Sequence, residues 1–389
     1  MLIGEIALVL CFVAQFNRKV PGNAYGTLSD CALAVSDMKP QSFESPLGTP
    51  LDTPQPDRRH WLKVLSTYRK PRIGRSVFEL LITVVPFIVV WGLAMIALHY
   101  GIWWGLILIV PAAGLLLRLF AIQHDCGHGA FFANRPWDNW TGRILSVLTF
   151  TPYDYWRHTH GVHHATAGNL DKRGLGDIIT LTVDEYRALS PSGRLRYRLY
   201  RHPVVLFGLG PAWIYLVQQR LPIGMMRGGL KPWLSTLTNT LAIVVMMTLL
   251  IWWLGVASVL LVQIPVVMLA GAAGIWLFYV QHQFEGTHWS NAAEWDFQTA
   301  ALKGSSHYDL PGVLRWITAN IGIHHVHHLA SQIPYYRLPE VLRDHPDLVP
   351  GRRMTIMDSV RTVKLVLWDE AGGRLVSFRE AASSRRHER

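Results

Sequence analysis

Histidine is the residue type whose number and spacing most clearly suggest chemistry in this chain of 389 residues, which contains 18 of them. Three clusters stand out, at 124–128, 160–164 and 324–328. Histidines in the first cluster lie four residues apart, and those in the other two lie three and four apart. Side chains at these spacings share one face of a helix, so each cluster can direct its imidazoles in one direction.

This pattern predicts a metal centre, because imidazole is a preferred ligand of iron, zinc, copper and nickel. His282 lies where it can join the three clusters. The predicted ligands are then His124, His128, His160, His163, His164, His282, His324, His327 and His328. A zinc site needs three or four ligands, so nine imidazoles indicate two metal ions. We favour iron, since paired iron can activate oxygen. The clusters contain no Glu-x-x-His, which excludes the carboxylate-rich di-iron type.

Other polar residues near the clusters are candidates for hydrogen-bonding to the ligands rather than for binding metal. We assign this supporting role to Asp125, His158 and His325, and consider His288 and His307 for it as well. For Asp125, an ordinary charge at the end of a helix is an equally good interpretation. The isolated histidines receive no role; these are His60, His99, His202, His345 and His387.

Two long runs without charged side chains must position these clusters. Leu80 to Leu117 is interrupted by His99-Tyr100-Gly101, and Leu234 to Val280 has Gly255 near its middle. A helix crosses a bilayer with about 20 apolar residues, so each run predicts two spans joined by a tight turn. The predicted fold is an all-α membrane protein. It has four transmembrane helices in two hairpins and a helical cap that carries the histidine-rich di-metal site.

The net charge of +11 reflects Lys and Arg residues that flank the apolar runs, which argues against a nucleic-acid partner. The positive-inside rule places 58–75, 118–231 and 281–389 in the cytoplasm, and with them the metal site. Pro203–Gln219 is short and broken by Gly and Pro, so we predict an interfacial or re-entrant segment there. Trp140–Phe150 is predicted to be another interfacial helix, and the Trp pairs 103–104 and 252–253 to form an aromatic belt.

The chain divides into three predicted parts. Residues 1–57 form a flexible leader, with Met38 as an alternative start; residues 58–350 form the membrane domain; residues 351–389 form a cytoplasmic tail. Three cysteines are too few for a disulfide framework or a four-cysteine iron–sulfur cluster. The sequence also lacks the G-x-G-x-x-G dinucleotide motif. Electrons for any redox reaction must therefore come from an external donor.

The clusters and their surroundings resemble the histidine boxes of the integral-membrane fatty acid desaturases. The motifs HDCGHGAFF at 124–132, WRHTHGVHH at 156–164 and NIGIHHVHHLASQIPYYRLPE at 320–340 resemble those of the omega-6 (delta-12) acyl desaturase branch. The resemblance covers roughly residues 58–350. It implies a di-iron centre, molecular oxygen, an acyl-lipid or acyl-carrier substrate, and two electrons from a ferredoxin or a cytochrome b5-like protein with its reductase.

Two alternative functions remain at this point. A hydroxylase or carotenoid ketolase on the same di-iron scaffold would add oxygen rather than form a double bond. A metal transporter would use the histidines to pass ions. Transport favours polar or charged residues within the spans, and both apolar runs lack charged side chains.

Overall fold

A computed structural model describes residues 58–351 and 353–383, and the chain from Arg58 onward forms one compact unit. The predicted leader, residues 1–57, lies outside the described residues. Within them, four helical stretches are long and apolar enough to cross a membrane. They comprise α4 (Ile73–His99), η2 with α5 (Trp103–Leu108 and Ile109–His128), α11 (Leu230–Leu254) and α12 (Val256–His282). The prediction of four membrane helices in two hairpins is therefore confirmed.

Glycine shapes both hairpin turns. Gly101 has φ 75° and Gly255 has φ 82°, a left-handed conformation that residues with a Cβ rarely adopt. Both tryptophan pairs are exposed beside these turns, as an aromatic belt requires. The long helices also expose many apolar side chains, which suits contact with lipid tails.

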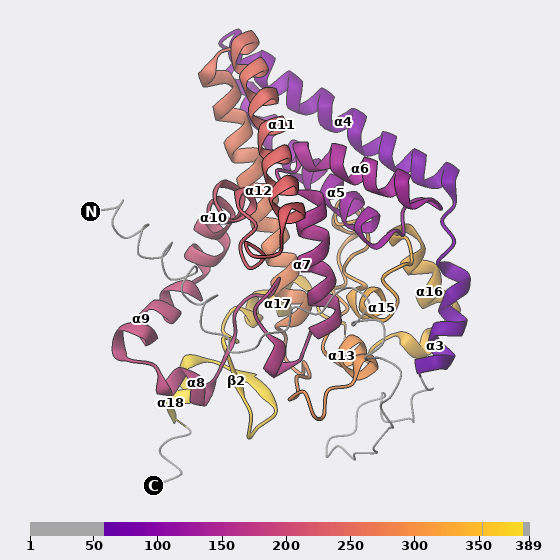
Figure 1. Ribbon diagram of the computed structural model, residues 1–389, viewed down its shortest axis with the longest axis vertical. Helices are drawn as coiled ribbons and strands as arrows, with labels where there is room; N and C mark the ends of the chain where they lie inside the picture. Colours follow the sequence, from indigo (N-terminus) through magenta and orange to yellow (C-terminus); the bar gives the residue numbers. More distant parts are fainter. Residues whose placement is uncertain (1–57, 352, 384–389) are drawn as a thin grey trace. The chain divides into compact units, whose positions relative to one another are not determined.

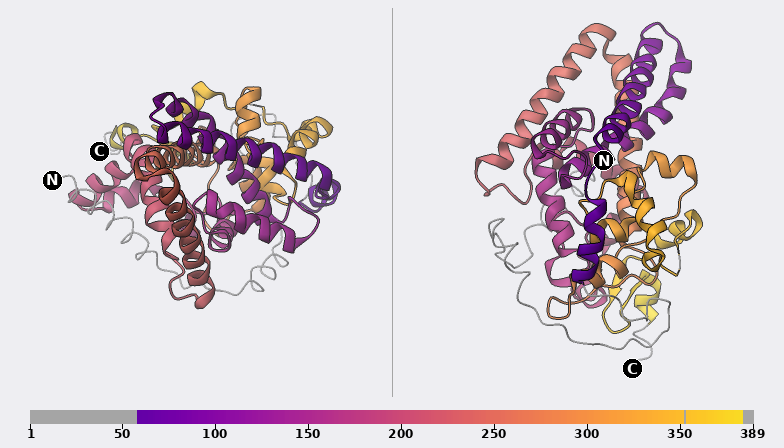
Figure 2. Two further views of the ribbon diagram at one scale, coloured as in Figure 1. Left: turned by 90° about the horizontal axis from the view of Figure 1, so that it is seen from above. Right: turned by 90° about the vertical axis from the view of Figure 1, so that its right-hand side faces the viewer.

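Most of the shorter helices lie towards the opposite end of the long ones, while α6 and α10 lie alongside them (Figures 1 and 2). Their bounds are α3 Arg58–Leu65, α6 Arg135–Leu148, α7 Tyr153–Thr166, α8 Val183–Ala188, α9 Pro191–Tyr200, α10 Gly210–Leu216, α13 Phe297–Lys303, α14 Gly312–Ile317, α15 His324–Leu329, α16 Leu338–Asp344, α17 Ile356–Thr362 and α18 Phe378–Ser383. Single turns of tighter or wider helix are η1 Ser66–Tyr68, η3 Leu170–Lys172, η4 Val204–Leu209, η5 Gln218–Arg220, η6 Tyr335–Arg337 and η7 Pro346–Leu348. The protein is thus mostly helical, as predicted.

A small sheet, which the sequence did not suggest, joins the two ends of the cap. β1 (Leu181–Thr182) pairs in parallel with β2 (Leu367–Asp369), and β2 pairs antiparallel with β3 (Arg374–Val376). Leu367 and Trp368 are buried in it. The segment predicted as a tail is therefore packed into the compact unit as far as the structure describes it.

The two predicted interfacial segments do form short helices. Helix α6 covers most of 140–150 and leaves Trp137, Trp140 and Ile144 exposed, while Leu145 is buried. Residues 203–219 fold into η4 and α10, which are too short to cross a bilayer. Both segments keep the shape expected of interfacial helices.

A buried ion pair joins the two ends of the first apolar run. Glu79 and Arg118 flank that run in sequence, and their side chains form a salt bridge inside the protein. Arg118 Nε also donates to Thr83 Oγ1 at 3.1 Å, and Tyr335 Oη lies 3.1 Å from Glu79 Oε2. The pair therefore ties α4 and α5 to the segment that follows α15.

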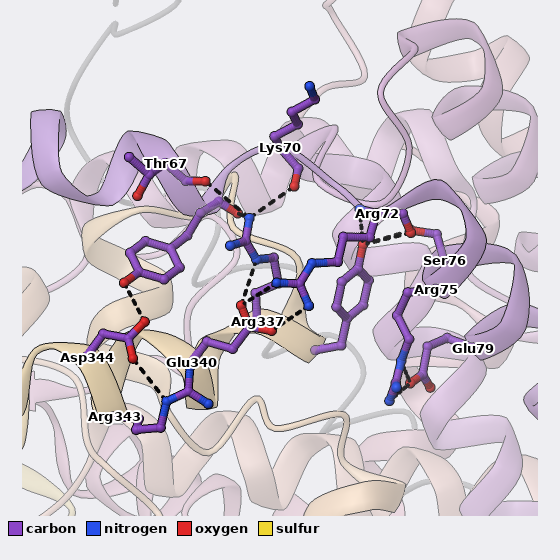
Figure 3. Close-up of polar contacts among 12 residues, drawn as sticks. Thr67, Lys70, Arg72, Arg75, Ser76, Glu79, Arg337, Glu340, Arg343 and Asp344 are labelled. Atoms are coloured by element: carbon purple, nitrogen blue, oxygen red, sulfur yellow. Dashed lines mark hydrogen bonds and ion pairs between the residues drawn. The ribbon is translucent and has the colours of Figure 1, made fainter.

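Charged contacts near the start of α4 hold the cap to the membrane helices (Figure 3). Arg72 forms a 2.9 Å salt bridge with Glu340 of α16. Arg337 bonds to the same carboxylate at 3.1 Å and donates to the carbonyls of Tyr68 and Lys70. The chain entering the first span is thereby fixed to the chain that leaves the third histidine cluster.

We predict that Arg118→Ala destabilises the protein by about 3 kcal/mol, because it leaves a buried carboxylate short of its partner. Arg75→Ala is the matched control. It removes the second arginine that bonds Glu79, but this side chain is 53% exposed, so the cost should stay below about 1 kcal/mol. Unfolding midpoints in detergent micelles measure both. Equal losses for the two variants would contradict the assignment.

Candidate metal centre

The first histidine group consists of His124, His128, His160, His164 and His327, and combines α5, α7 and α15. Their candidate ligand atoms all lie within 4.8 Å of one another. Nε2 of His160 lies 3.1 Å from Nε2 of both His128 and His164, and Nε2 atoms of His164 and His327 are 3.2 Å apart. The helical spacing of each cluster therefore brings its rings to one place.

The second group consists of His163, His282, His324 and His328, from α7, α12 and α15. All four side chains are buried, and their candidate ligand atoms are again within 4.8 Å of one another. Nε2 of His282 lies 3.1 Å from that of His163 and 3.0 Å from that of His324. Nε2 of His328 is buried without a hydrogen-bond partner in the described part of the chain. This orphaned nitrogen is a ready ligand atom.

The two groups are neighbours. The rings of His164 and His328 stack with centroids 4.1 Å apart, and each belongs to a different group. Helices α7 and α15 contribute to both groups, since adjacent histidines on each helix point to different sides. The structure thus divides the nine predicted ligands into sets of five and four.

Hydrogen bonds orient two rings of the second group. His163 Nδ1 lies 2.5 Å from a carboxylate oxygen of Asp177, and His282 Nδ1 lies 3.2 Å from the carbonyl of Gly304. A proton on each Nδ1 leaves the Nε2 lone pair free for a metal. Asp177 was not among the residues that the sequence pattern indicated. In the sequence it is an acidic residue that follows Gly174 and Gly176. This pattern is too common to indicate a role at the site.

Asp125 connects the first group to the segment after α15. One carboxylate oxygen lies 3.4 Å from His124 Nδ1, and the other accepts the backbone N–H of Tyr335 at 2.7 Å. Trp156 stacks on His160 with ring centroids 4.6 Å apart. A Cβ at Gly127 would come within 3.0 Å of the Trp156 ring, so glycine allows this close approach.

The remaining histidines considered for support lie outside both groups. His158 and His288 are exposed. His325 is buried, donates from Nε2 to the Leu348 carbonyl at 2.9 Å, and packs beside His307 with centroids 5.4 Å apart. His325 therefore anchors α15 to η7.

Burial sets the protonation of the cluster. It lowers the pKa of His160, His164, His327 and His328 well below the usual range, and the neighbouring imidazoles lower it further. Neutral rings keep the lone pair that a metal needs. Imidazole binds first-row metals at about 2 Å, so two ligands of one ion lie roughly 3 Å apart. The observed nitrogen separations fit such ions.

The fold and the site together define a membrane protein with a polyhistidine metal site between its helices. Comparison with known proteins identifies the family. The sequence model of the family "Fatty acid desaturase" matches residues 101–359. The chain is 41% identical to a "Fatty acid desaturase" of Bacillus subtilis over 82% of this chain and 90% of that protein.

More distant relatives are similar over shorter stretches. An endoplasmic-reticulum omega-3 fatty acid desaturase of Vigna radiata is 28% identical over 66% of this chain and 68% of its own length. An sn-1 acyl-lipid omega-3 desaturase (ferredoxin) of Synechocystis is 29% identical over 58% of this chain and 62% of its own. The chain belongs to the fatty acid desaturase family, and is an oxygen-dependent oxidoreductase that acts on acyl lipids.

We predict that Asp177→Asn weakens metal binding at the second group about tenfold or more, because an amide would orient the His163 ring less firmly than the carboxylate does. Asp184→Asn, which changes a carboxylate that is 81% exposed on α8, is the control and should leave metal affinity unchanged. Titration of the metal-free protein with ferrous iron measures both affinities. Equal affinities would show that Asp177 does not support the site.

Stability of the metal-free protein should fall as the pH drops below about 6.5. Unfolded histidines take up protons there, whereas the buried rings of lowered pKa do so only at more acidic pH. In that window each such ring lowers the free energy of unfolding by about 1.4 kcal/mol for every pH unit of acidification. Denaturant unfolding between pH 7.5 and 5.5 measures the slope. A flat or rising profile would contradict neutral buried rings.

Proposed function

We propose that the protein is a di-iron desaturase that introduces a cis double bond into an acyl chain. The observation that supports this most strongly is the division of nine buried or half-buried histidines into two compact groups. The first group would hold one iron ion and the second group the other. Bound iron would supply the activation of oxygen that the reaction requires.

The balanced reaction explains why a metal is needed. Two adjacent methylenes, O₂, two electrons and two protons give the alkene and two waters. The methylene hydrogens are not acidic, so a general base cannot remove them. The residues of this chain hold the metal, exclude water and orient ligands. Trp156 contributes by stacking on the His160 ring, and Phe278 by packing at a tilt against the His163 ring.

A small cavity lies beside the second group. It measures about 40 Å³ and is lined by Phe278 and Trp289, by the polar side chains of Asn169, Asp177 and Gln283, and by His163 and His282. This volume suits a molecule of about the size of water rather than an acyl chain. Holding an acyl chain in a fixed position near one metal would select the carbon that reacts.

For the position of the double bond we propose the omega-6 (delta-12) type. Support comes from the motifs around the three histidine clusters, which resemble that branch. The plant and cyanobacterial relatives described above carry omega-3 in their names, so omega-3 is the competing position.

The electron donor is proposed to be a ferredoxin or a cytochrome b5-like protein with its reductase. The name of the Synechocystis relative includes ferredoxin, which favours the first. Helix α9 carries Arg194, Arg196 and Arg198, and an acidic donor would be attracted to such a basic segment. We place this surface and the metal site on the cytoplasmic side, following the positive-inside rule.

Expression in a bacterial or yeast host tests the function directly. We expect a new unsaturated fatty acid by mass spectrometry, with its double bond at the omega-6 position, and none with His164→Ala. Co-expressed ferredoxin or cytochrome b5 with the matching reductase ensures that electrons are supplied. Oxygenated lipids would favour a hydroxylase or ketolase instead. Iron uptake into proteoliposomes without any lipid product would favour a transporter.

A further inference from the structure

A second cavity lies outside the two histidine groups and has no part in the proposed reaction. It measures about 260 Å³ and is bordered by α14, α16 and the chain around residue 353. Its polar lining includes Arg315, Arg343, Arg353, His307 and Asn320, and one carboxylate, that of Asp309. The cavity is thus large enough for a phosphate group and its immediate substituents.

The charges around this cavity favour an anion. Arg315 and Arg353 both contact Asp309, at 2.9 Å and 3.5 Å, so one carboxylate is shared by two guanidinium groups. Arg343 adds a third positive charge and lies 3.0 Å from Asp344, with its side chain 72% exposed (Figure 3). Arginine forms paired hydrogen bonds with phosphate oxygens, so this lining matches a phosphate well.

One buried polar atom of the lining also lacks a partner. The side chain of His307 is buried, yet its Nδ1 has no hydrogen-bond partner within the described residues. Buried polar atoms are nearly always hydrogen-bonded in native proteins, so an unpaired one indicates a missing ligand or water. Asn320, which lines the cavity, and the preceding Ala319 both have left-handed backbone, with φ of 55° and 51°. Such strained residues cluster at ligand sites.

The position of α14 indicates where the anion comes from. A Cβ on Gly114, about halfway along the second membrane span, would lie 3.6 Å from the Ile317 side chain, so α14 lies alongside that span. Val313, Leu314 and Trp316 of α14 are exposed. Arg315, in the middle of this apolar surface, lines the cavity. A polar cavity behind an apolar, membrane-adjacent helix suits an amphipathic lipid.

We propose that this cavity binds the phosphate of a glycerophospholipid headgroup. Arg315, Arg343 and Arg353 would contact the phosphate oxygens, and the acyl chains would lie along the exposed side of α14. None of the nine candidate ligand histidines lines this cavity, so the proposal does not require the proposed reaction.

The test measures lipid binding to the full-length protein in detergent micelles by native mass spectrometry. Short-chain phosphatidylglycerol is the probe, and the matching diacylglycerol, which lacks the phosphate, is compared with it. We expect phosphatidylglycerol to bind and diacylglycerol to bind at least about tenfold more weakly, since hydrogen bonds to charged groups contribute strongly. Equal binding of the two lipids would overturn the proposal.

Substitutions locate the site. R343Q/R353Q should weaken phosphatidylglycerol binding about tenfold or more. The control is R361Q, which neutralises an arginine of α17 that is 74% exposed and does not line the cavity; it should leave binding unchanged. The single variant R343Q removes the charge of an exposed side chain and leaves the contacts of Asp309 intact. It should weaken phosphatidylglycerol binding in part, and it provides the test if the double variant is unstable.

Two results would overturn the proposal at this stage. One is unchanged binding in both R343Q and a folded R343Q/R353Q protein. The other is inorganic phosphate displacing the lipid at a similar concentration, because that would show a site for free phosphate rather than for a lipid headgroup.

Discussion

The structure depends on gathering nine imidazoles in a space from which water is largely excluded. Their Nε2 atoms approach to 3.0–3.2 Å, a separation at which nitrogen lone pairs repel unless a proton or a metal lies between them. Where both Nδ1 protons are used by oxygen acceptors, as in His163 and His282, the facing Nε2 atoms carry lone pairs, and a bound metal cation would relieve their repulsion. Every element that contributes a ring must hold its position against this repulsion, and the surrounding contacts are arranged to do so.

Four helices carry the rings, and polar contacts beside the site fix two of them, α5 and α15. Asp125 links α5 to Tyr335, and Tyr335 in turn bonds the buried Glu79 that pairs with Arg118. His325 fixes α15 through the Leu348 carbonyl. The membrane spans thus do more than anchor the protein: the ends of α5 and α12 next to the cap set the positions of His124, His128 and His282, while helices of the cap carry the other six rings.

Much of this could be predicted from the sequence, because it depends on local periodicity. The apolar runs predicted the four spans. The spacing of three and four residues predicted that the imidazoles of each cluster point in one direction. What escaped prediction depends on contacts between distant segments. Asp177 bonds His163 across a glycine-rich turn, and Glu79 meets Arg118 across a hairpin. The strands β1 and β2 are only two and three residues long, and nearly 190 residues separate them in the sequence. No local pattern reveals such a pairing.

The most direct test of the account is the number of iron ions bound per chain. The full-length protein, reconstituted with ferrous iron under anaerobic conditions, should bind two ions, as measured by elemental analysis against protein concentration. His160→Ala should reduce occupancy of the first group, and His282→Ala that of the second, so that each variant retains about one ion. A single ion in the unsubstituted protein, or none, would contradict the assignment of the nine histidines to two metal sites.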